Sequence, residues 1–185
     1  MIPELGQVFL VAALTSALLQ FLGGISSLSK NIPNIELFVE RTTAIQTFFL
    51  IICFGLLTTS FLQDDFSVLY VASNSNTALP IAYKFAAVWG GHEGSLLLWV
   101  LILAVWTLFL SKDKALKSLP ELRIQSLSIL GLISLGFIIF ILYTSNPFER
   151  LLPIPIQGRG LNPLLQDPAL VIHPPTLYAG YVGLA

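Results

Sequence analysis

The sequence predicts an all-α, polytopic helical membrane protein with four complete transmembrane helices and the start of a fifth. Two observations support this prediction. Of the 185 residues, 55% are hydrophobic and only 10% are charged, whereas a soluble domain carries about 25% charged residues. The charges are also clustered, which leaves four stretches without Asp, Glu, Lys or Arg, at residues 5–29, 42–63, 94–111 and 124–148. Each stretch is long enough, at about 1.5 Å per residue in a helix, to cross a hydrocarbon core of roughly 30 Å.

We expect residues 1–185 to form a single membrane domain. The spans are predicted at about residues 3–23, 41–62, 93–110 and 122–143, and a fifth apolar stretch runs from residue 174 onward. This stretch opens with Pro174-Pro175, and proline is favourable in the first turn of a helix because no N–H is needed there. About a dozen residues cannot span a bilayer. We therefore expect the sequence to be the N-terminal part of a longer protein.

The basic residues predict the orientation, because short loops rich in Lys and Arg remain in the cytoplasm. Six basic residues lie between the first and second spans or between the third and fourth: Lys30, Arg41, Lys112, Lys114, Lys117 and Arg123. Only Lys84, Arg150 and Arg159 lie on the other side. We therefore expect the N-terminus outside, together with two outer loops, residues 63–92 and 144–173, which contain both histidines.

The composition excludes several classes of function. A net charge of −1 leaves no basic patch for nucleic acid. The single cysteine, Cys53, cannot form an intrachain disulfide, and no Cys-x-x-Cys redox or zinc pair exists in the sequence. The only methionine is the first residue. Any metal chemistry of this sequence therefore depends on His92, His173 or carboxylates.

The first outer motif, WGGHEGSLLLW at residues 89–99, lies where the third span enters the membrane. Its Gly90-Gly91 pair lets the backbone turn tightly or come close to a flat ligand. Trp89 and His92 are therefore candidates for binding a cofactor. The alternative is an interfacial belt, in which Trp89 anchors at the lipid headgroups and His92 is a helix cap or a polar lid.

The second outer motif, QGRGLNPLLQDPALVIHPP, occupies residues 157–175. Arg159 stands between two glycines, from where its guanidinium can reach a carboxylate or phosphate with two hydrogen bonds; the alternative is a solvated loop arginine. Pro174 disfavours helical geometry at His173, so we expect this ring just ahead of the fifth helix, at or below the membrane surface. A neutral imidazole there suits an iron ligand, and a buried structural histidine is the alternative.

These motifs resemble those of the CcmF family of cytochrome c-type biogenesis proteins, the haem lyase subunits, and of their NrfE-like relatives. The resemblance includes residues 89–99, Asn146-Pro147-Phe148 and residues 158–175, and it extends over essentially the whole chain from the Pro-Glu-Leu-Gly near the N-terminus. It implies a protein that receives haem on the outer, periplasmic face from the carrier CcmE. Such a protein assists the thioether attachment of haem to apocytochrome c, beside the CcmH-type thiol subunit. The implied location is the bacterial inner membrane, or the mitochondrial inner membrane for a plant organelle.

The resemblance also implies a b-type haem held in the membrane, with His173 as one axial ligand of the iron. The family's tryptophan-rich haem-handling segment and the second ligand of the b haem are missing from the sequence, so we expect no lyase activity from these residues alone. Arg159, Trp89 and His173 would offer a cation for haem propionates, an aromatic wall and an iron ligand. Two other hypotheses are a non-catalytic docking subunit of the maturation complex and a haem transporter. The absence of charged residues at mid-bilayer depth in the four spans argues against proton-coupled transport.

Overall fold

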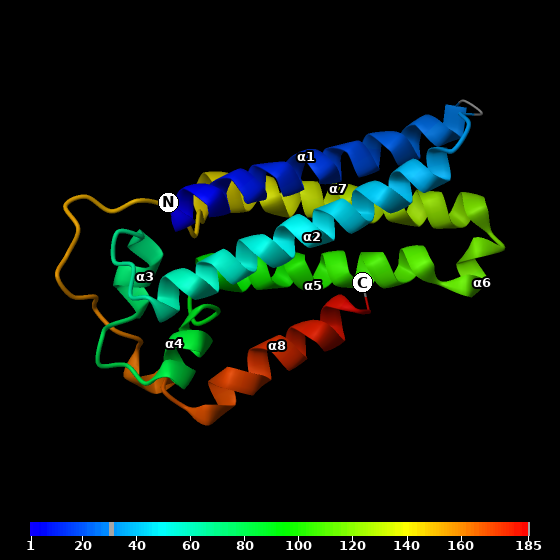
Figure 1. The fold of residues 1–185 in the computed structure, drawn as a ribbon. Coiled ribbons are helices and arrows are strands. Elements are labelled where there is room, and N and C mark those ends of the chain that lie inside the picture. The colour runs from blue at the N-terminus through cyan, green and yellow to red at the C-terminus, as the bar shows by residue number, and fades with distance from the viewer. Residues whose placement is uncertain (30–31, 185) are drawn as a thin grey trace.

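The computed structural model describes residues 1–29 and 32–184 and consists mainly of helices (Figure 1). The four long helices are α1 (Ile2–Ser29), α2 (Ile35–Leu62), α5 (His92–Lys112) and α7 (Pro120–Thr144). The shorter helices are α3 (Leu69–Asn74), α4 (Ile81–Ala87), α6 (Lys114–Lys117), the 3-10 turn η1 (Pro163–Leu165) and α8 (Pro168–Val182). An isolated antiparallel bridge joins Val68 to Arg150.

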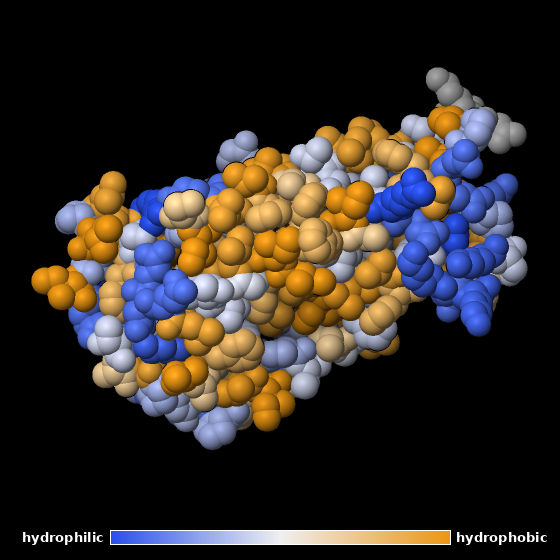
Figure 2. Space-filling model, in the orientation of Figure 1, coloured by the Kyte–Doolittle hydropathy of each residue, from blue (hydrophilic) through white to orange (hydrophobic). Residues whose placement is uncertain are grey.

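Each of the four long helices is long and apolar enough to cross a membrane, which confirms the predicted fold class. The helices contain the predicted spans and extend past them; α2, for example, begins at Ile35 rather than near Arg41. Figure 2 shows a broad apolar band over the middle of the bundle, between two more hydrophilic ends. Exposed side chains such as Phe48 and Phe109 suit contact with lipid chains.

Small polar side chains join the long helices inside the bundle. The Gln20 amide of α1 donates to the Leu127 carbonyl of α7 at 2.7 Å, and the Ser128 hydroxyl donates back to the Phe21 carbonyl at 2.9 Å. These bonds join neighbouring helices. In a membrane there is no hydrophobic driving force between helices, and hydrogen bonds between polar side chains help the helices to associate. Gln20 and Ser128 therefore contribute to the packing of α1 against α7.

A tight connection reverses the chain between α5 and α7. The Asp113 carboxylate accepts the N–H groups of Ala115 and Leu116 at 2.8 and 3.0 Å, and so caps the short helix α6. Pro120 lies in the first turn of α7, where its missing N–H costs no hydrogen bond. This connection brings α5 and α7 together as neighbours.

The two ends of the bundle differ in chemistry. At one end, which we call the loop end, α1 and α5 begin and α2 and α7 end, and α3, α4 and residues 145–167 gather there (Figure 1). The opposite, basic end carries Arg41, Lys112, Lys114, Lys117 and Arg123. The sixth basic residue of the predicted cytoplasmic side, Lys30, lies outside the described residues. The side of the membrane that each end faces stays a prediction.

The last helix differs from the sequence prediction. α8 begins at Pro168, ahead of Pro174, so His173 lies within the helix rather than just before it. The cause is a strong helix start upstream: the Asp167 carboxylate accepts the Ala169 N–H at 2.7 Å, which is the contact that an N-cap residue makes. The bias of Pro174 against helical geometry at the preceding residue is overcome by this earlier start.

Candidate functional site

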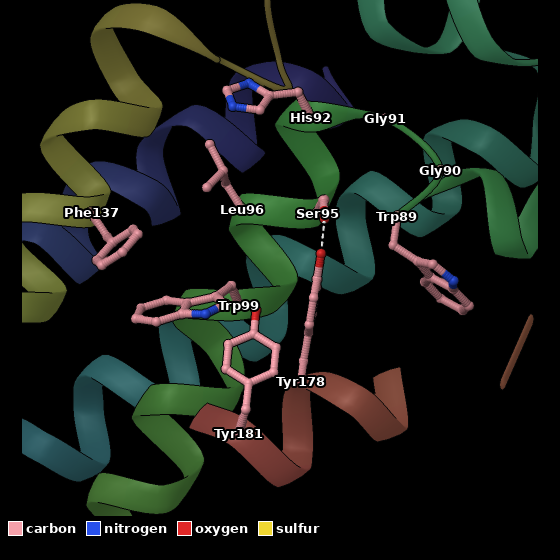
Figure 3. A pocket seen from close by; sticks show the side chains of 10 residues that line it. All are labelled: Trp89, Gly90, Gly91, His92, Ser95, Leu96, Trp99, Phe137, Tyr178 and Tyr181. Carbon is pink, nitrogen blue, oxygen red and sulfur yellow. Dashed lines mark hydrogen bonds between the residues drawn. The ribbon is translucent and has the colours of Figure 1, made fainter. Parts of the chain in front are cut away.

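A hollow of about 470 Å³ lies among α5, α7 and α8, beside the first turns of α5 (Figure 3). Its lining is mostly aromatic, and we call it the aromatic hollow. The residues that line it are Trp89, Gly90, Gly91, His92, Ser95, Leu96, Trp99, Phe137, Tyr178 and Tyr181. The hollow therefore brings the first outer motif together with the helix that follows the second one.

Flat aromatic rings form the walls of the hollow. Trp99 of α5 and Phe137 of α7 stack with ring centroids 4.0 Å apart. Tyr178 and Tyr181 of α8 meet edge to face at 5.6 Å, and the Tyr178 hydroxyl bonds to the Ser95 hydroxyl (Figure 3). This bond holds α8 against α5. A concave site with flat apolar walls and a few polar groups suits a planar, largely apolar ligand.

One buried hydroxyl, that of Tyr70 in α3, holds the turn that leads into α5. Tyr70 is 2% exposed; its hydroxyl accepts the Gly91 N–H at 3.0 Å and donates to the Val88 carbonyl at 3.0 Å. Burial raises the pKa of the Tyr70 phenol, so the hydroxyl keeps the proton that it donates. A Cβ atom at Gly94 would overlap the Val88 carbonyl oxygen. The tight turn after Trp89 therefore requires glycine at this position.

Trp89 is part of the packed interior at the edge of the hollow. It is 6% exposed and meets the ring of Phe85 edge to face at 4.9 Å and stacks with that of Phe54 at 6.5 Å. A tryptophan that anchors at lipid headgroups would keep its ring at the exposed surface. The alternative of Trp89 as an interfacial anchor is therefore wrong.

His92 stands at the rim of the hollow, as the first residue of α5 (Figure 3). The N-cap position belongs to Gly91, so the alternative of His92 as the helix cap is wrong. Its Nδ1 atom is 2.9 Å from the Ser145 hydroxyl oxygen at the end of α7, and its ring meets that of Phe140 at 6.3 Å. Nε2 makes no hydrogen bond to any residue that the structure describes, and is therefore available to a ligand.

Arg159 lies in the loop that crosses α3, outside the lining of the hollow. Its backbone N–H donates to the Ala72 carbonyl at 2.8 Å, and the Gly160 N–H donates to the Ser75 carbonyl at 3.1 Å. These bonds fix the backbone of the loop. The side chain of Arg159 is exposed.

The other two basic residues at the loop end, Lys84 and Arg150, are paired. Lys84 binds Asp64 at 2.5 Å, with both side chains largely buried, and Arg150 binds Glu4. By contrast, the Arg159 guanidinium makes no ion pair or hydrogen bond among the residues that the structure describes. It is therefore available to an anionic group that approaches the loop end.

His173 also lies outside the lining of the hollow. Its side chain is exposed on the same helix as Tyr178, about 7.5 Å nearer the start of α8 at a rise of about 1.5 Å per residue. The structure thus brings Trp89 and His92 to one hollow, whereas Arg159 and His173 lie in the neighbouring loop and helix at the loop end.

Five residues at or beside the hollow were not predicted from the sequence: Tyr70, Ser145, Phe137, Tyr178 and Tyr181. The contacts of these residues cross long stretches of chain: 53 positions separate His92 from Ser145, and 83 separate Ser95 from Tyr178. One local signal was present, because tyrosines three positions apart share a face of a helix.

The fold and the site define a polytopic helical membrane protein with an aromatic hollow near one end of its bundle. The sequence matches the family model described as "Cytochrome C assembly protein" over residues 89–185. The chain belongs to this cytochrome c assembly protein family.

Similar proteins confirm the resemblance to CcmF and NrfE. The "Cytochrome c-type biogenesis protein CcmF" of Pseudomonas aeruginosa is 50% identical over 100% of this chain and 28% of its own length. The NrfE protein of Haemophilus influenzae is 45% identical over 100% of this chain and 29% of its own. The CcmF protein of Escherichia coli is 54% identical over 71% of this chain and 20% of its own. The chain thus spans less than a third of the length of these relatives.

A solved structure titled "Cytochrome c Heme Lyase CcmF" has the same fold. It superposes with a TM-score of 0.81 at 23% sequence identity, over 100% of this chain and 28% of the solved one. At this identity the likeness concerns the fold alone.

Proposed function

We propose that this chain is a membrane-spanning part of a haem lyase for cytochrome c maturation, and that its aromatic hollow holds haem near the loop end. The observation that carries the proposal is the hollow itself, in which the stacked rings of Trp99 and Phe137 offer one flat apolar wall and His92 offers an imidazole nitrogen. The names of the relatives, which refer to cytochrome c-type biogenesis, support the same reading.

The residues of the hollow fit haem in shape and chemistry. Aromatic walls suit a planar macrocycle, and an imidazole nitrogen is a usual haem-iron ligand. None of the described residues that line the hollow carries a carboxylate, so the propionates of haem would meet no like charge there. Bound haem supplies the vinyl groups to which cysteine thiols add when a cytochrome c is matured.

His173 and Arg159 belong to this proposal as neighbours of the hollow. The exposed His173 imidazole would ligate haem iron, and the free Arg159 guanidinium would pair with a propionate. The resemblance implies a b-type haem within the membrane as the haem that His173 binds. The position of His173 near the start of α8 favours haem at the membrane surface, so the experiment below must separate the two.

The partners follow from the same proposal. We expect the loop end to face the periplasm, where a carrier of the CcmE type delivers haem and a CcmH-type thiol subunit presents apocytochrome c. The surrounding lipid belongs to the bacterial inner membrane, or to the mitochondrial inner membrane in a plant organelle. Residues 1–185 would act as one membrane domain that supports the loop end.

The test is the haem content and absorbance spectrum of the protein, purified from membranes as its gene encodes it. Trp99→Ala removes a wall of the hollow and should lower the haem bound per protein several-fold. His173→Ala should abolish the absorbance of the haem that it ligates. If His173→Ala loses the reduced haem spectrum that the protein has as purified, the haem that His173 ligates is the b-type haem. If it loses only the haem that the carrier supplies, the haem that His173 ligates is the one at the membrane surface.

Trp106→Ala is the matched control, because Trp106 lies on α5 and bonds to the Ala179 carbonyl of α8 at 3.0 Å without lining the hollow. Its haem content should equal that of the unaltered protein. Haem retained in full by Trp99→Ala and by His173→Ala would contradict the proposal. If changes in the loops then abolished co-purification of partner proteins, the hypothesis of a docking subunit would replace the haem lyase proposal. Movement of haem across vesicle membranes would instead favour the hypothesis of a haem transporter.

A further inference from the structure

A chain of hydrogen bonds runs from the His92 ring along the end of α7. Nδ1 of His92 lies 2.9 Å from the Ser145 hydroxyl oxygen, which lies 3.3 Å from the Thr144 hydroxyl oxygen. The Thr144 hydroxyl in turn donates to the Phe140 carbonyl at 2.7 Å. This series of hydrogen bonds therefore ends at a carbonyl oxygen, which can accept a hydrogen bond but cannot donate one.

The direction of the protons follows from counting donors. A hydroxyl has one hydrogen to donate, and that of Thr144 goes to the Phe140 carbonyl, so Thr144 can only accept from Ser145. If the hydrogen of Ser145 goes to Thr144, then Ser145 can only accept from His92. With this arrangement both contacts of the Ser145 hydroxyl are hydrogen bonds. It puts the proton of the neutral imidazole on Nδ1.

The imidazole is then held in one tautomer, with a lone pair on Nε2. The hydrogen bond that one ring nitrogen makes decides which nitrogen is protonated, and so which one can bind a metal. Ser145 is well placed for this, since it is 4% exposed and its own N–H is bonded to the Ile141 carbonyl at 3.1 Å. The ring of Phe140 lies edge to face with the imidazole, at a centroid distance of 6.3 Å.

We propose that His92 is an axial ligand of haem iron through Nε2, and that Ser145 is the positioning residue that fixes its tautomer. This rests on the proposed function, because it requires haem in the aromatic hollow. It goes further by assigning the ring nitrogen that binds the iron and the residue that orients the ring.

The test uses the gene-encoded protein in detergent, with haemin added and reduced by dithionite. His92→Gly should weaken haem affinity and abolish the iron–histidine stretching band in the resonance Raman spectrum of the reduced, five-coordinate haem, and added imidazole should restore this band by occupying the vacated position. Ser145→Ala should shift the iron–histidine stretching frequency in the resonance Raman spectrum and weaken affinity roughly 10-fold, the lower end of the usual effect of a residue that orients a ligand. Ser145→Thr, which keeps the hydroxyl, should restore both.

The outcomes separate this inference from the proposed function. If His92→Gly leaves the spectrum unchanged while Trp99→Ala still lowers haem content, the ligand assignment is overturned and haem in the hollow stands. If neither variant alters bound haem, both fall. A purely structural histidine would show no rescue by imidazole. If His92→Gly behaves as expected but Ser145→Ala does not alter the Raman frequency, the positioning role is overturned.

Discussion

The hydroxyl of Tyr70 joins the short helix α3 to the turn that leads into α5. The hydroxyl is the hydrogen-bond partner of the Gly91 N–H and of the Val88 carbonyl, at 3.0 Å each. These two groups lie in a turn that is too tight for them to form helical hydrogen bonds. Because the phenol is buried, no water can take over these contacts. The geometry of the aromatic hollow thus depends on a residue that does not line it.

At this scale we expect Tyr70→Phe to destabilise the protein by about 1–3 kcal/mol, since the Gly91 N–H and the Val88 carbonyl lose a buried partner. The ring itself fits, because Phe keeps the edge-to-face contact with Phe61 at 5.2 Å. The measurement is the thermal unfolding midpoint in detergent. Tyr143→Phe, on an exposed ring, is the control. A midpoint for Tyr70→Phe equal to that of the control would contradict the role given to this hydroxyl.

The single residues of the site were predictable in part. The Gly90-Gly91 pair and the helix start identified Trp89 and His92 as candidates, because these signals lie within a few positions of each other. Ser145 could not be identified in this way, since its contact with His92 depends on how α7 packs beside α5. Long-range packing is not encoded in any local pattern.

At the scale of elements, the contact between α1 and α7 is set by small residues. A Cβ atom at Gly24 would overlap the Cβ of Ser128, and the Ser128 hydroxyl bonds to the Phe21 carbonyl just before Gly24. Close approach of backbones is the usual purpose of small residues between membrane helices.

We therefore expect Gly24→Ala to push α1 and α7 apart and to lower stability by about 1–3 kcal/mol, the usual effect of overpacking. The matched control is Gly136→Ala in α7, where a Cβ would meet nothing within 4 Å; alanine there favours the helix. The two midpoints of SDS-induced unfolding should move in opposite directions. Equal effects would mean that the close contact at Gly24 has no energetic consequence.

The elements themselves were largely predictable, because long apolar stretches without charge leave little choice in a membrane. α8 was the exception. The sequence contained both the Asp167 cap and the Pro174 bias, and the prediction gave weight to the proline alone. The cap determines the start of α8 at Pro168, since an N-cap satisfies free N–H groups at the first turn.

At the scale of the whole molecule, the bundle separates its charges by end. Around the basic end Arg123 is 5% exposed and bonds to Glu36 at 3.1 Å, and Lys112 pairs with Glu40. Basic residues nevertheless outnumber acidic residues in the segment that connects α5 to α7, where three lysines and Arg123 stand against Asp113 and Glu121. A surplus of basic residues in a short connection is the signal that keeps it in the cytoplasm.

We therefore expect the loop end to face the periplasm, and accessibility of single cysteines can test this. Ile156→Cys reports on the loop end, where Ile156 is fully exposed, and Ser118→Cys reports on the exposed basic end. The native Cys53 is buried, so it adds little background, and the unaltered protein corrects for the remainder. In intact spheroplasts a membrane-impermeant maleimide should label Ile156→Cys at once and Ser118→Cys only after lysis. The reverse pattern would put the aromatic hollow near the cytoplasmic surface, where a periplasmic haem carrier could not reach it.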